Sequence, residues 1–445
     1  MPSSNHTGIV GTISGSRHAR RVLASAFVLA ASCAAARADG VSAAGVLFEP
    51  PSNAAEAADE GVAVHTFIKM MKPQFGAKNV ATRAAAGLPP YSGYGIETPG
   101  SLQCIYGFQS SGATACNPNQ VVPLTSLGSN SSTIAIVDAY DYPAAAADLA
   151  AFSAQFGLPA PTSANFSVVY ASGSKPANGS GSGWDIEAAL DIEYAHAMAP
   201  NAKIILVEAK SASFADLFTA VQVAAGYVAA AKNGGQVSMS WGGAEFSYEA
   251  SYDSVFSGNH VVFYAAAGDN PGTIYPCVSP NVVCVGGTSN RRGGAANNFA
   301  FEGQFAWSST GGGPSLYEAL PTFQSTSSAA SVIGSMRGAP DVAALADPNN
   351  GVWVYNTTYE RGAQWWQVGG TSAATPITAG LDNAAGNFAL NSAAYLGVLY
   401  HYSGAERTLV TSGYCGFNYA YAAGSSWSFC TGYGVPRPLN GLAQL

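Results

Sequence analysis

Charged side chains are scarce in this sequence: they make up 10% of its 445 residues, while 48% are hydrophobic. Because a disordered regulator combines low hydrophobicity with high charge, this composition excludes that class. Lys and Arg together number 18 against 26 acidic residues, and no basic tract follows the N-terminal region. Phosphate binding needs clustered cations, so no nucleic-acid partner is expected. Few charges of either sign also suit a protein that works in acid, because few cations then remain to repel one another.

Long apolar runs are missing too, except for one near the N-terminus. Residues 17–21 are cationic, residues 22–36 are apolar, and Ala36 and Ala38 supply the small residues that signal peptidase reads. A membrane anchor is the alternative, but the run falls short of the roughly 20 residues that cross a bilayer. We therefore expect residues 1–38 to be a signal peptide. The mature protein is then secreted or periplasmic, free of the membrane and monomeric.

Cysteine is rare, with seven in the chain. Without Cys33 in the signal, six remain, and an even number in an exported chain predicts disulfides. Six cysteines allow many pairings; we predict neighbour pairing because each near pair brackets one turn-rich loop, and buried free thiols are the alternative. Metal binding is disfavoured because no histidine accompanies a pair at ligand spacing. The predicted pairs are Cys104–Cys116, Cys277–Cys284 and Cys415–Cys430.

The organisation of the chain changes near residue 98. Residues 39–97 are rich in Ala, Gly and Pro, with one short helical stretch at 64–71, and are predicted to be a leader or short prosegment. In residues 98–445, runs that are apolar on both faces alternate with helical stretches, which indicates one α/β domain with a parallel sheet covered on both sides. The expected strands are 133–138, 203–208, 236–240 and 260–266, and the expected helices are 144–156, 186–198, 214–231 and 248–256.

Two carboxylates share one face of the helix expected at 186–198. Glu187 and Asp191 are four residues apart, a spacing at which like charges repel. On an otherwise apolar helix such a pair is either solvated or shares a proton. Asp185 and Glu193 add further acids, so spacing alone does not decide between the two.

A serine and an aspartate stand at the ends of other elements. Ser372 lies in a Gly-Gly-Thr-Ser sequence between a strand-like stretch and a helix expected at 377–385, where backbone N–H groups suit a developing oxyanion. Asp269 follows a buried strand, and active-site groups gather at the carboxyl ends of strands in open α/β sheets. An ordinary helix-capping serine and a turn aspartate are the alternatives.

Taken together, these clusters resemble the motifs of the sedolisin family, the serine-carboxyl peptidases with a subtilisin-like fold. The family's ExxxD helix is matched by residues 187–191, its AxGD turn by Asp269, and its SGTSxxxP motif by residues 369–376, with Gly369 where serine is commoner. The resemblance covers residues 98–445, with its motifs in order. Further agreeing stretches are 134–140, 240–243, 275–276, 285–288, 307–313 and 337–342.

The resemblance implies a role for each matched residue. Ser372 is the nucleophile, Glu187 the base, and Asp191 holds Glu187, while Asp269 lies in the oxyanion hole; Asp138 and Trp241 match accessory positions that extend the carboxylate network in some relatives. The residues agree with this on their own terms. A serine nucleophile needs a base, which is usually histidine. No histidine of this sequence lies in an HGTH-like motif, the setting of the catalytic histidine in histidine-triad subtilases. His196 is five residues past Asp191 and so lies off the helix face that carries Asp191. A carboxylate base works best in acid.

Acidic residues are absent after Glu406. The family's calcium site uses aspartates of a DITxG motif and a GWD turn, and the matching stretches, 409–413 and 426–428, contain none. Calcium favours carboxylate oxygens, so no cofactor is expected. Family members also usually carry a long folded prodomain, whose place only residues 39–97 could take.

The sequence thus predicts an exported endopeptidase that hydrolyses proteins or peptides in acid through Ser372, Glu187 and Asp191, with Asp269 in the oxyanion hole. The alternative is a catalytically silent family member that acts as a secreted binding protein, and retention of all four residues argues against it. A histidine-triad subtilase lacks support without HGTH, and a pepsin-type enzyme lacks support because no DTG or DSG occurs.

Overall fold

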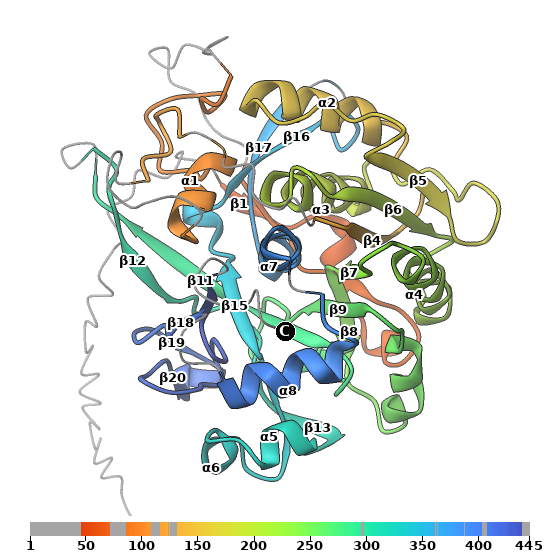
Figure 1. The fold of residues 1–445 in the computed structure, drawn as a ribbon, viewed down its shortest axis with the longest axis vertical. Helices are drawn as coiled ribbons and strands as arrows, with labels where there is room; N and C mark the ends of the chain where they lie inside the picture. The colour runs from red at the N-terminus through yellow and green to blue at the C-terminus, as the bar shows by residue number, and fades with distance from the viewer. Residues whose placement is uncertain are drawn as a thin grey trace, which may run out of the picture. The chain divides into compact units, whose positions relative to one another are not determined.

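The computed structural model describes residues 46–71, 86–107, 116–122, 124, 131–294, 298–360, 362, 364–386, 388–402 and 407–437, and the structural statements below concern these residues. The predicted signal peptide, residues 1–38, and Cys33 lie outside them. Figure 1 shows the helices and strands in their arrangement.

A large sheet forms the centre of the fold, in the strand order β12-β11-β9-β7-β4-β6-β5, with β15 also paired to β11. All its pairings are parallel except that of β12 with β11. The four strands expected from the sequence are all present. The bounds are β4 (Thr133–Ala139), β5 (Phe166–Tyr170), β6 (Lys203–Ala209), β7 (Gly235–Met239), β9 (Val261–Ala266), β11 (Val283–Arg292), β12 (Phe301–Ala306) and β15 (Val342–Leu345).

Helices cover both faces of this sheet, as predicted. Along β4, Ile134 and Ile136 belong to the core that includes α2 (Ala145–Phe156), α3 (Trp184–Met198) and α7 (Thr371–Ala385). Ala135 and Val137 alternate with them and face α4 (Phe214–Ala229), because successive side chains of a strand point to opposite faces. Figure 1 shows α3 and α7 next to each other, with α4 beyond β4 and β6. The helix expected at 248–256 is a 3₁₀ helix, η3 (Glu249–Phe256).

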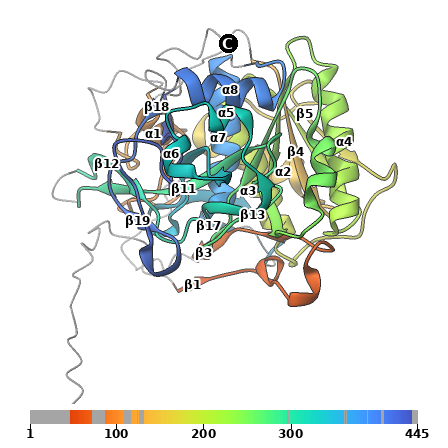
Figure 2. The same cartoon turned by 90° about the horizontal axis from the view of Figure 1, so that it is seen from below.

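Residues 46–71, here called the leader segment, pair with two strands of the main body. β2 (His65–Thr66) pairs with β8 (Trp241–Ala244), and β3 (Lys69–Met71) lies between β1 (Leu47–Phe48) and β17 (Gln364–Gly369). The helix predicted at 64–71 is therefore wrong: two strand edges, distant in sequence, supply the backbone partners that make this stretch extended. In Figure 2 the leader segment runs along the lower side, beside β17.

Glu97, on the N-terminal side of residue 98, also packs into the main body. Glu97 is fully buried and forms an ion pair with the equally buried Arg292, while Asn290 donates a further hydrogen bond to it at 2.9 Å. A buried charge costs free energy unless it is paired, so Glu97 is fixed in the core of the main body.

The three predicted disulfides are confirmed, with Cα atoms 5.4 Å apart in Cys104–Cys116, 4.7 Å in Cys277–Cys284 and 5.6 Å in Cys415–Cys430. No helix of the described residues is both long and apolar enough to cross a membrane. The remaining elements are η1 (Pro51–Asn53), η2 (Ala57–Asp59), α1 (Pro99–Ile105), β10 (Ile274–Tyr275), β13 (Gly313–Ala319), α5 (Thr322–Ser325), α6 (Ala330–Ile333), β14 (Met336–Ala339), η5 (Pro348–Asn350), β16 (Val352–Asn356), α8 (Ser392–Tyr402), β18 (Arg407–Thr408), β19 (Tyr414–Cys415), η6 (Phe417–Tyr419), β20 (Tyr421–Ala422) and β21 (Val435–Pro436).

Candidate active site

Helix α3 is buried along its whole length of 15 residues. It packs against the sheet and against α7, which lies beside it on the same sheet. Its N-cap is Gly183, whose φ of 99° lies in the left-handed region that glycine adopts without strain. A solvated acidic face on this helix is therefore excluded. Its four carboxylates must instead be hydrogen-bonded, or neutral.

Two of these four carboxylates have local structural partners. Asp185 accepts hydrogen bonds from the Gly181 amide at 3.0 Å and the Thr358 hydroxyl at 2.8 Å. Glu193 accepts one from the Tyr355 amide at 3.1 Å. Glu187 and Asp191, the pair singled out by spacing, have fewer donors: Asp191 accepts one hydrogen bond, from the Ser240 hydroxyl at 2.8 Å, and Glu187 accepts none of ordinary geometry from the described residues.

Asp138 joins this pair from the sheet. It lies on the same face of β4 as Ile134 and Ile136, the face that α3 covers, and its register partner on β6 is Glu208. Burial raises the pKa of Asp138 to about 8, and the charge of Glu208 adds to the rise. Neither carboxyl oxygen of Asp138 has a hydrogen-bond partner among the described residues. A buried carboxyl without donors favours its neutral form.

The carboxyl groups of Glu187 and Asp191 are also pushed towards their neutral forms. Burial raises the pKa of Glu187 far above its usual range, Asp191 and Asp138 raise it further, and the nearby Ser372 hydroxyl acts against this rise. Burial raises the pKa of Asp191 in the same way, and Asp138 adds to it. Three neighbouring buried carboxyl groups cannot all be ionised, so this cluster holds protons at pH values where free carboxyl groups have lost them.

Ser372 is the second residue of α7, immediately after the turn at Gly370. Its hydroxyl donates to the Ser240 carbonyl oxygen at 3.2 Å and accepts from the Phe67 amide at 3.1 Å. Neither oxygen of Glu187 has a hydrogen bond of ordinary geometry within the described part of the chain, although the Ser372 hydroxyl is near enough to influence it. The predicted nucleophile and base are thus brought together.

Ser240 connects Asp191 to the helix that carries Ser372, the predicted nucleophile, and the sequence did not reveal this link. Pro376 lies inside α7 and has no N–H to give to the Ser372 carbonyl oxygen four residues earlier. The Ser240 hydroxyl lies 3.2 Å from that oxygen and 2.8 Å from Asp191 Oδ1. One hydroxyl proton cannot serve both acceptors, but a protonated Asp191 would donate to Ser240, which would then donate to Ser372. The proline four residues after Ser372 is the signal that could have pointed to this link.

Asp269 has one oxygen engaged and one without a partner. Oδ1 accepts from the Thr371 amide at 2.7 Å and from the Thr371 hydroxyl at 2.9 Å, whereas Oδ2 is buried and has no partner among the described residues. Burial raises the pKa of Asp269 to about 7, against the effect of the Lys69 charge. A protonated Oδ2 would donate a hydrogen bond, as an oxyanion requires.

Gly370 opens the space into which Oδ2 faces. Its φ is 103°, and a Cβ there would lie 2.8 Å from Asp269 Oδ2 and 1.9 Å from the Phe67 carbonyl oxygen. Only glycine permits that oxygen to come so close. The neighbouring Gly369, which departs from the family motif, also has no room for a side chain, because its Cβ would lie 2.5 Å from the Ala346 carbonyl oxygen.

The accessory residues have different positions. The fully buried indole of Trp241 donates to the Val137 carbonyl oxygen at 2.8 Å, and so holds the end of β4 next to Asp138. His196 is buried, with its Nε2 2.8 Å from the Pro159 carbonyl oxygen, and burial lowers the pKa of this histidine. It is a packed histidine. The described hydrogen bonds of Ser372 involve no histidine.

The stretches that match the family's calcium loop contain no carboxylate, and several of their oxygens take part in hydrogen bonds. The Ser412 carbonyl oxygen accepts from the Ala306 amide at 2.8 Å, and the Gly413 carbonyl oxygen accepts from the Ala423 amide at 3.0 Å. The Ser428 hydroxyl is 3.2 Å from that of Thr431. Over the described ranges, no group of three or more His, Cys, Asp or Glu side chains could hold a metal ion. That this loop binds no calcium stays a prediction, based on its lack of carboxylates.

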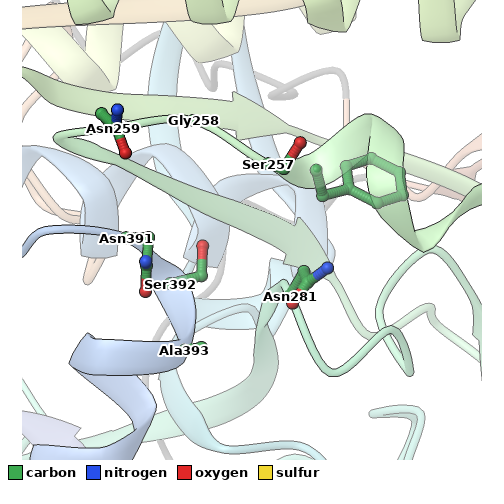
Figure 3. A pocket seen from close by; sticks show the side chains of 8 residues that line it. Ser257, Gly258, Asn259, Asn281, Asn391, Ser392 and Ala393 are labelled. Carbon is green, nitrogen blue, oxygen red and sulfur yellow. The ribbon is translucent and has the colours of Figure 1, made fainter.

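A pocket lies at the opposite end of the sheet from these carboxylates. Figure 3 shows Asn391 and Ser392, at the start of α8, across from Ser257 and Asn259, which precede β9. Asp269 lies beyond the other end of β9, so this pocket does not belong to the candidate site.

Known proteins resemble the chain in both sequence and structure. The family model of the subtilase peptidases matches residues 170–390 of this chain. Kumamolisin of Bacillus sp. (strain MN-32) is 33% identical over 330 residues, which cover 67% of this chain and 57% of kumamolisin. Sedolisin of Pseudomonas sp. (strain 101) is 33% identical over 176 residues, which cover 36% of this chain and 28% of sedolisin.

A solved structure of the Pseudomonas sedolisin, a serine-carboxyl proteinase complexed with two molecules of pseudo-iodotyrostatin, matches the fold with a TM-score of 0.61. The two chains are 24% identical, and the match covers 80% of this chain and 96% of that one. The predicted subtilisin-like fold is confirmed. The chain spans 57% of the length of kumamolisin.

Proposed function

The chain belongs to the sedolisin family, and on this premise we propose that it is an exported serine-carboxyl endopeptidase that hydrolyses proteins in acid. One observation carries the proposal: Ser372, at the start of a buried helix, lies beside the carboxyl of Glu187 and next to an aspartate with one buried oxygen free. The substrates are proteins or peptides.

Each residue contributes one step of the reaction. Ser372 Oγ attacks the carbonyl carbon of the scissile bond while Glu187 takes its proton. The negative charge that develops on the carbonyl oxygen is stabilised by the Ser372 amide and by protonated Asp269 Oδ2. Glu187 then gives its proton to the leaving amine, and water hydrolyses the acyl-serine by the same steps in reverse order. Asp191, neutral and bonded to Ser240, places no second negative charge beside Glu187 and so leaves it free to act as the base.

Acid favours this arrangement for two reasons. Asp269 donates only when protonated, and its pKa of about 7 sets the upper limit of that state. Asp191 and Asp138 must be neutral so that Glu187 is the one ionised carboxylate among these three neighbouring buried groups and can act as the base. Export is supported by the three disulfides, which form and persist in oxidising compartments.

The test is the loss of peptide hydrolysis in Ser372→Ala and in Glu187→Ala, with melting temperatures near that of the wild type. Residues that act as one unit have non-additive effects, so the double variant should be little worse than either single one. Denatured protein is the substrate, across about pH 2 to 8, and the exposed Glu302→Gln is the matched control. If Glu187→Ala keeps its activity while His196→Ala loses it, the carboxylate mechanism is wrong. A folded wild type that hydrolyses nothing would instead support the silent binding protein.

A further inference from the structure

The leader segment lies across the site in the way a substrate would. On one side of Phe67, β2 pairs antiparallel with β8, placing Thr66 opposite Trp241. On the other side, β3 pairs antiparallel with β17, placing Lys69 opposite Gly369. Backbone pairing on both sides of a short gap holds that gap extended in front of the nucleophile.

The peptide bond after Phe67 is the one presented to Ser372. The Phe67 amide donates to Ser372 Oγ at 3.1 Å, and the Ser372 amide donates to the Phe67 carbonyl oxygen at 3.2 Å. That carbonyl oxygen also lies beside Gly370, on the side that Asp269 Oδ2 faces. The Phe67 carbonyl therefore occupies the position of a scissile carbonyl in the oxyanion hole, and Ile68 carries the leaving amine.

Asn53 holds the chain on both sides of this bond. Its Nδ2 donates to the Ile68 carbonyl oxygen at 2.8 Å, and its Oδ1 accepts from the Thr66 hydroxyl at 2.8 Å. Ser52 supports the same hydroxyl from 2.6 Å. A flexible peptide substrate lacks such internal hydrogen bonds. In the leader segment they fix the geometry of the Phe67–Ile68 bond independently of its contacts with the active site.

Two further contacts would join the pieces if the bond were cut. β1 lies upstream of the bond and pairs with β3 downstream of it, with Leu47 opposite Met71. Glu49, also upstream, forms an ion pair with Lys69. Ile68 is fully buried. Cleavage would therefore leave the new amine next to the acyl carbon, because the contacts that cross the cut remain.

We propose that the leader segment is a built-in inhibitor of this site, in which the Asn53 clamp makes Phe67–Ile68 a bond that the enzyme cuts slowly and re-forms. This rests on the proposed peptidase function and adds the regulation of that site. In the forward step Ser372 Oγ bonds to the Phe67 carbonyl carbon, the bond to Ile68 N breaks, and that nitrogen takes the proton held by Glu187. In the reverse step the retained Ile68 amine attacks the acyl-serine and Oγ regains a proton from Glu187. An amine held in place has a high effective concentration and competes with water.

The test follows the full chain after a shift from neutral pH to about pH 4, by intact mass and by activity on an added denatured protein. The wild type should be cut between Phe67 and Ile68, with its pieces remaining together and with low activity. Asn53→Ala should be cut on the order of tenfold faster, as expected from the loss of one or two hydrogen bonds, and should gain activity in parallel. Thr66→Val, which keeps the shape but loses the hydroxyl donor, should act in the same direction. The exposed Val62→Ala is the control, and Ser372→Ala should stay intact.

Re-formation of the Phe67–Ile68 bond is measured separately, as recovery of intact chain. When separated from uncut chain and incubated afresh, the cut wild-type complex should regain some intact chain, and cut Asn53→Ala should regain far less. Equal cleavage rates in wild type, Asn53→Ala and Thr66→Val would overturn the clamp. Hydrolysis of the added protein with Phe67–Ile68 intact would overturn the inhibitor while leaving the peptidase function standing, whereas failure to hydrolyse either substrate in every variant would overturn the proposed function itself.

Discussion

Replacing Asp269 by asparagine separates the donor role of this residue from its titration. The amide fits the site, because asparagine Oδ1 can accept from the Thr371 amide and hydroxyl as the carboxylate does at 2.7 and 2.9 Å. Its Nδ2 then takes the place of Oδ2, which has no partner among the described residues. The variant thus carries a permanent donor towards the oxyanion, whereas the wild type carries one only while protonated.

The stability effect follows from the pKa. Burial raises the pKa of Asp269 from 3.8 to about 7, and each unit corresponds to about 1.4 kcal/mol. Below pH 3.8 the carboxyl is neutral in both the folded and the unfolded chain, so its titration does not lower the free energy of unfolding. As pH rises towards 7 the unfolded chain ionises and the folded one does not, so stability falls by roughly 4 kcal/mol in total. Asparagine escapes this loss, so the variant should match the wild type near pH 3 and exceed it by up to that amount above pH 7.

The effect on activity has the same cause. Loss of an oxyanion donor typically costs 10²- to 10³-fold in kcat, and ionisation of Asp269 above its pKa of about 7 removes this donor from the wild type. In Asp269→Asn this decline should disappear, although the maximal rate is expected to be lower because a neutral amide is a weaker donor than a carboxylic acid. Activity should therefore persist to higher pH than in the wild type.

The measurements are kcat against pH and the free energy of unfolding in urea at about pH 3 and pH 8, with Glu302→Gln as the control for removing an exposed carboxylate. Identical pH profiles for wild type and variant would refute the donor role of Asp269. An unmutated enzyme with its optimum above pH 7 would contradict the whole mechanism.

Two other predictions concern the hydrogen bond from Ser240 to Asp191 and the disulfide between Cys415 and Cys430. Ser240→Ala should lower kcat about tenfold and shift its pH profile, because Asp191 Oδ1 loses its 2.8 Å partner, and Ser240→Thr should restore both; a purely structural role would leave the profile unmoved. Replacing Cys415 and Cys430 by serine should lower the melting temperature by several degrees, since closing a loop of 15 residues is worth roughly 3 kcal/mol. EDTA should leave that temperature unchanged, and a tightly bound calcium found by elemental analysis would disprove this.

Local patterns predicted the elements whose form depends on their own sequence. The strand at 133–138 and the helix at 186–198 were found from β-branched runs and helical spacing, and both lie within one or two residues of the observed β4 and α3. The stretch at 64–71 was wrong because its own residues tolerate helix, and only the edges of β8 and β17 make it extended. No local pattern contains those partners.

The candidate site shows the same division. The spacing of Glu187 and Asp191 predicted that they share a face, but not that the other two acids of the helix are taken up by Thr358 and Tyr355. The resemblance predicts Ser372 as the nucleophile, and the structure adds that Phe67 lies against it. Contacts between residues far apart in sequence depend on the whole fold, so neither the hydrogen bonds of Asn53 nor those of Ser240 could be derived from spacing.

Raised pKa values extend beyond the carboxyls of the proposed site, and they affect the expected stability of Asp269→Asn. Burial raises the pKa of Glu208 to about 7, of Asp138 to about 8 and of Glu249 to about 9. Each of these groups contributes stability that is complete below the pKa of the unfolded chain and is lost as pH rises through the folded value. Asp269→Asn removes one such group, so its stability should still decline towards neutral pH, only less steeply than that of the wild type. Activity, in contrast, depends on the donor itself, and the two readouts therefore separate a carboxyl that serves the fold from one that serves the reaction.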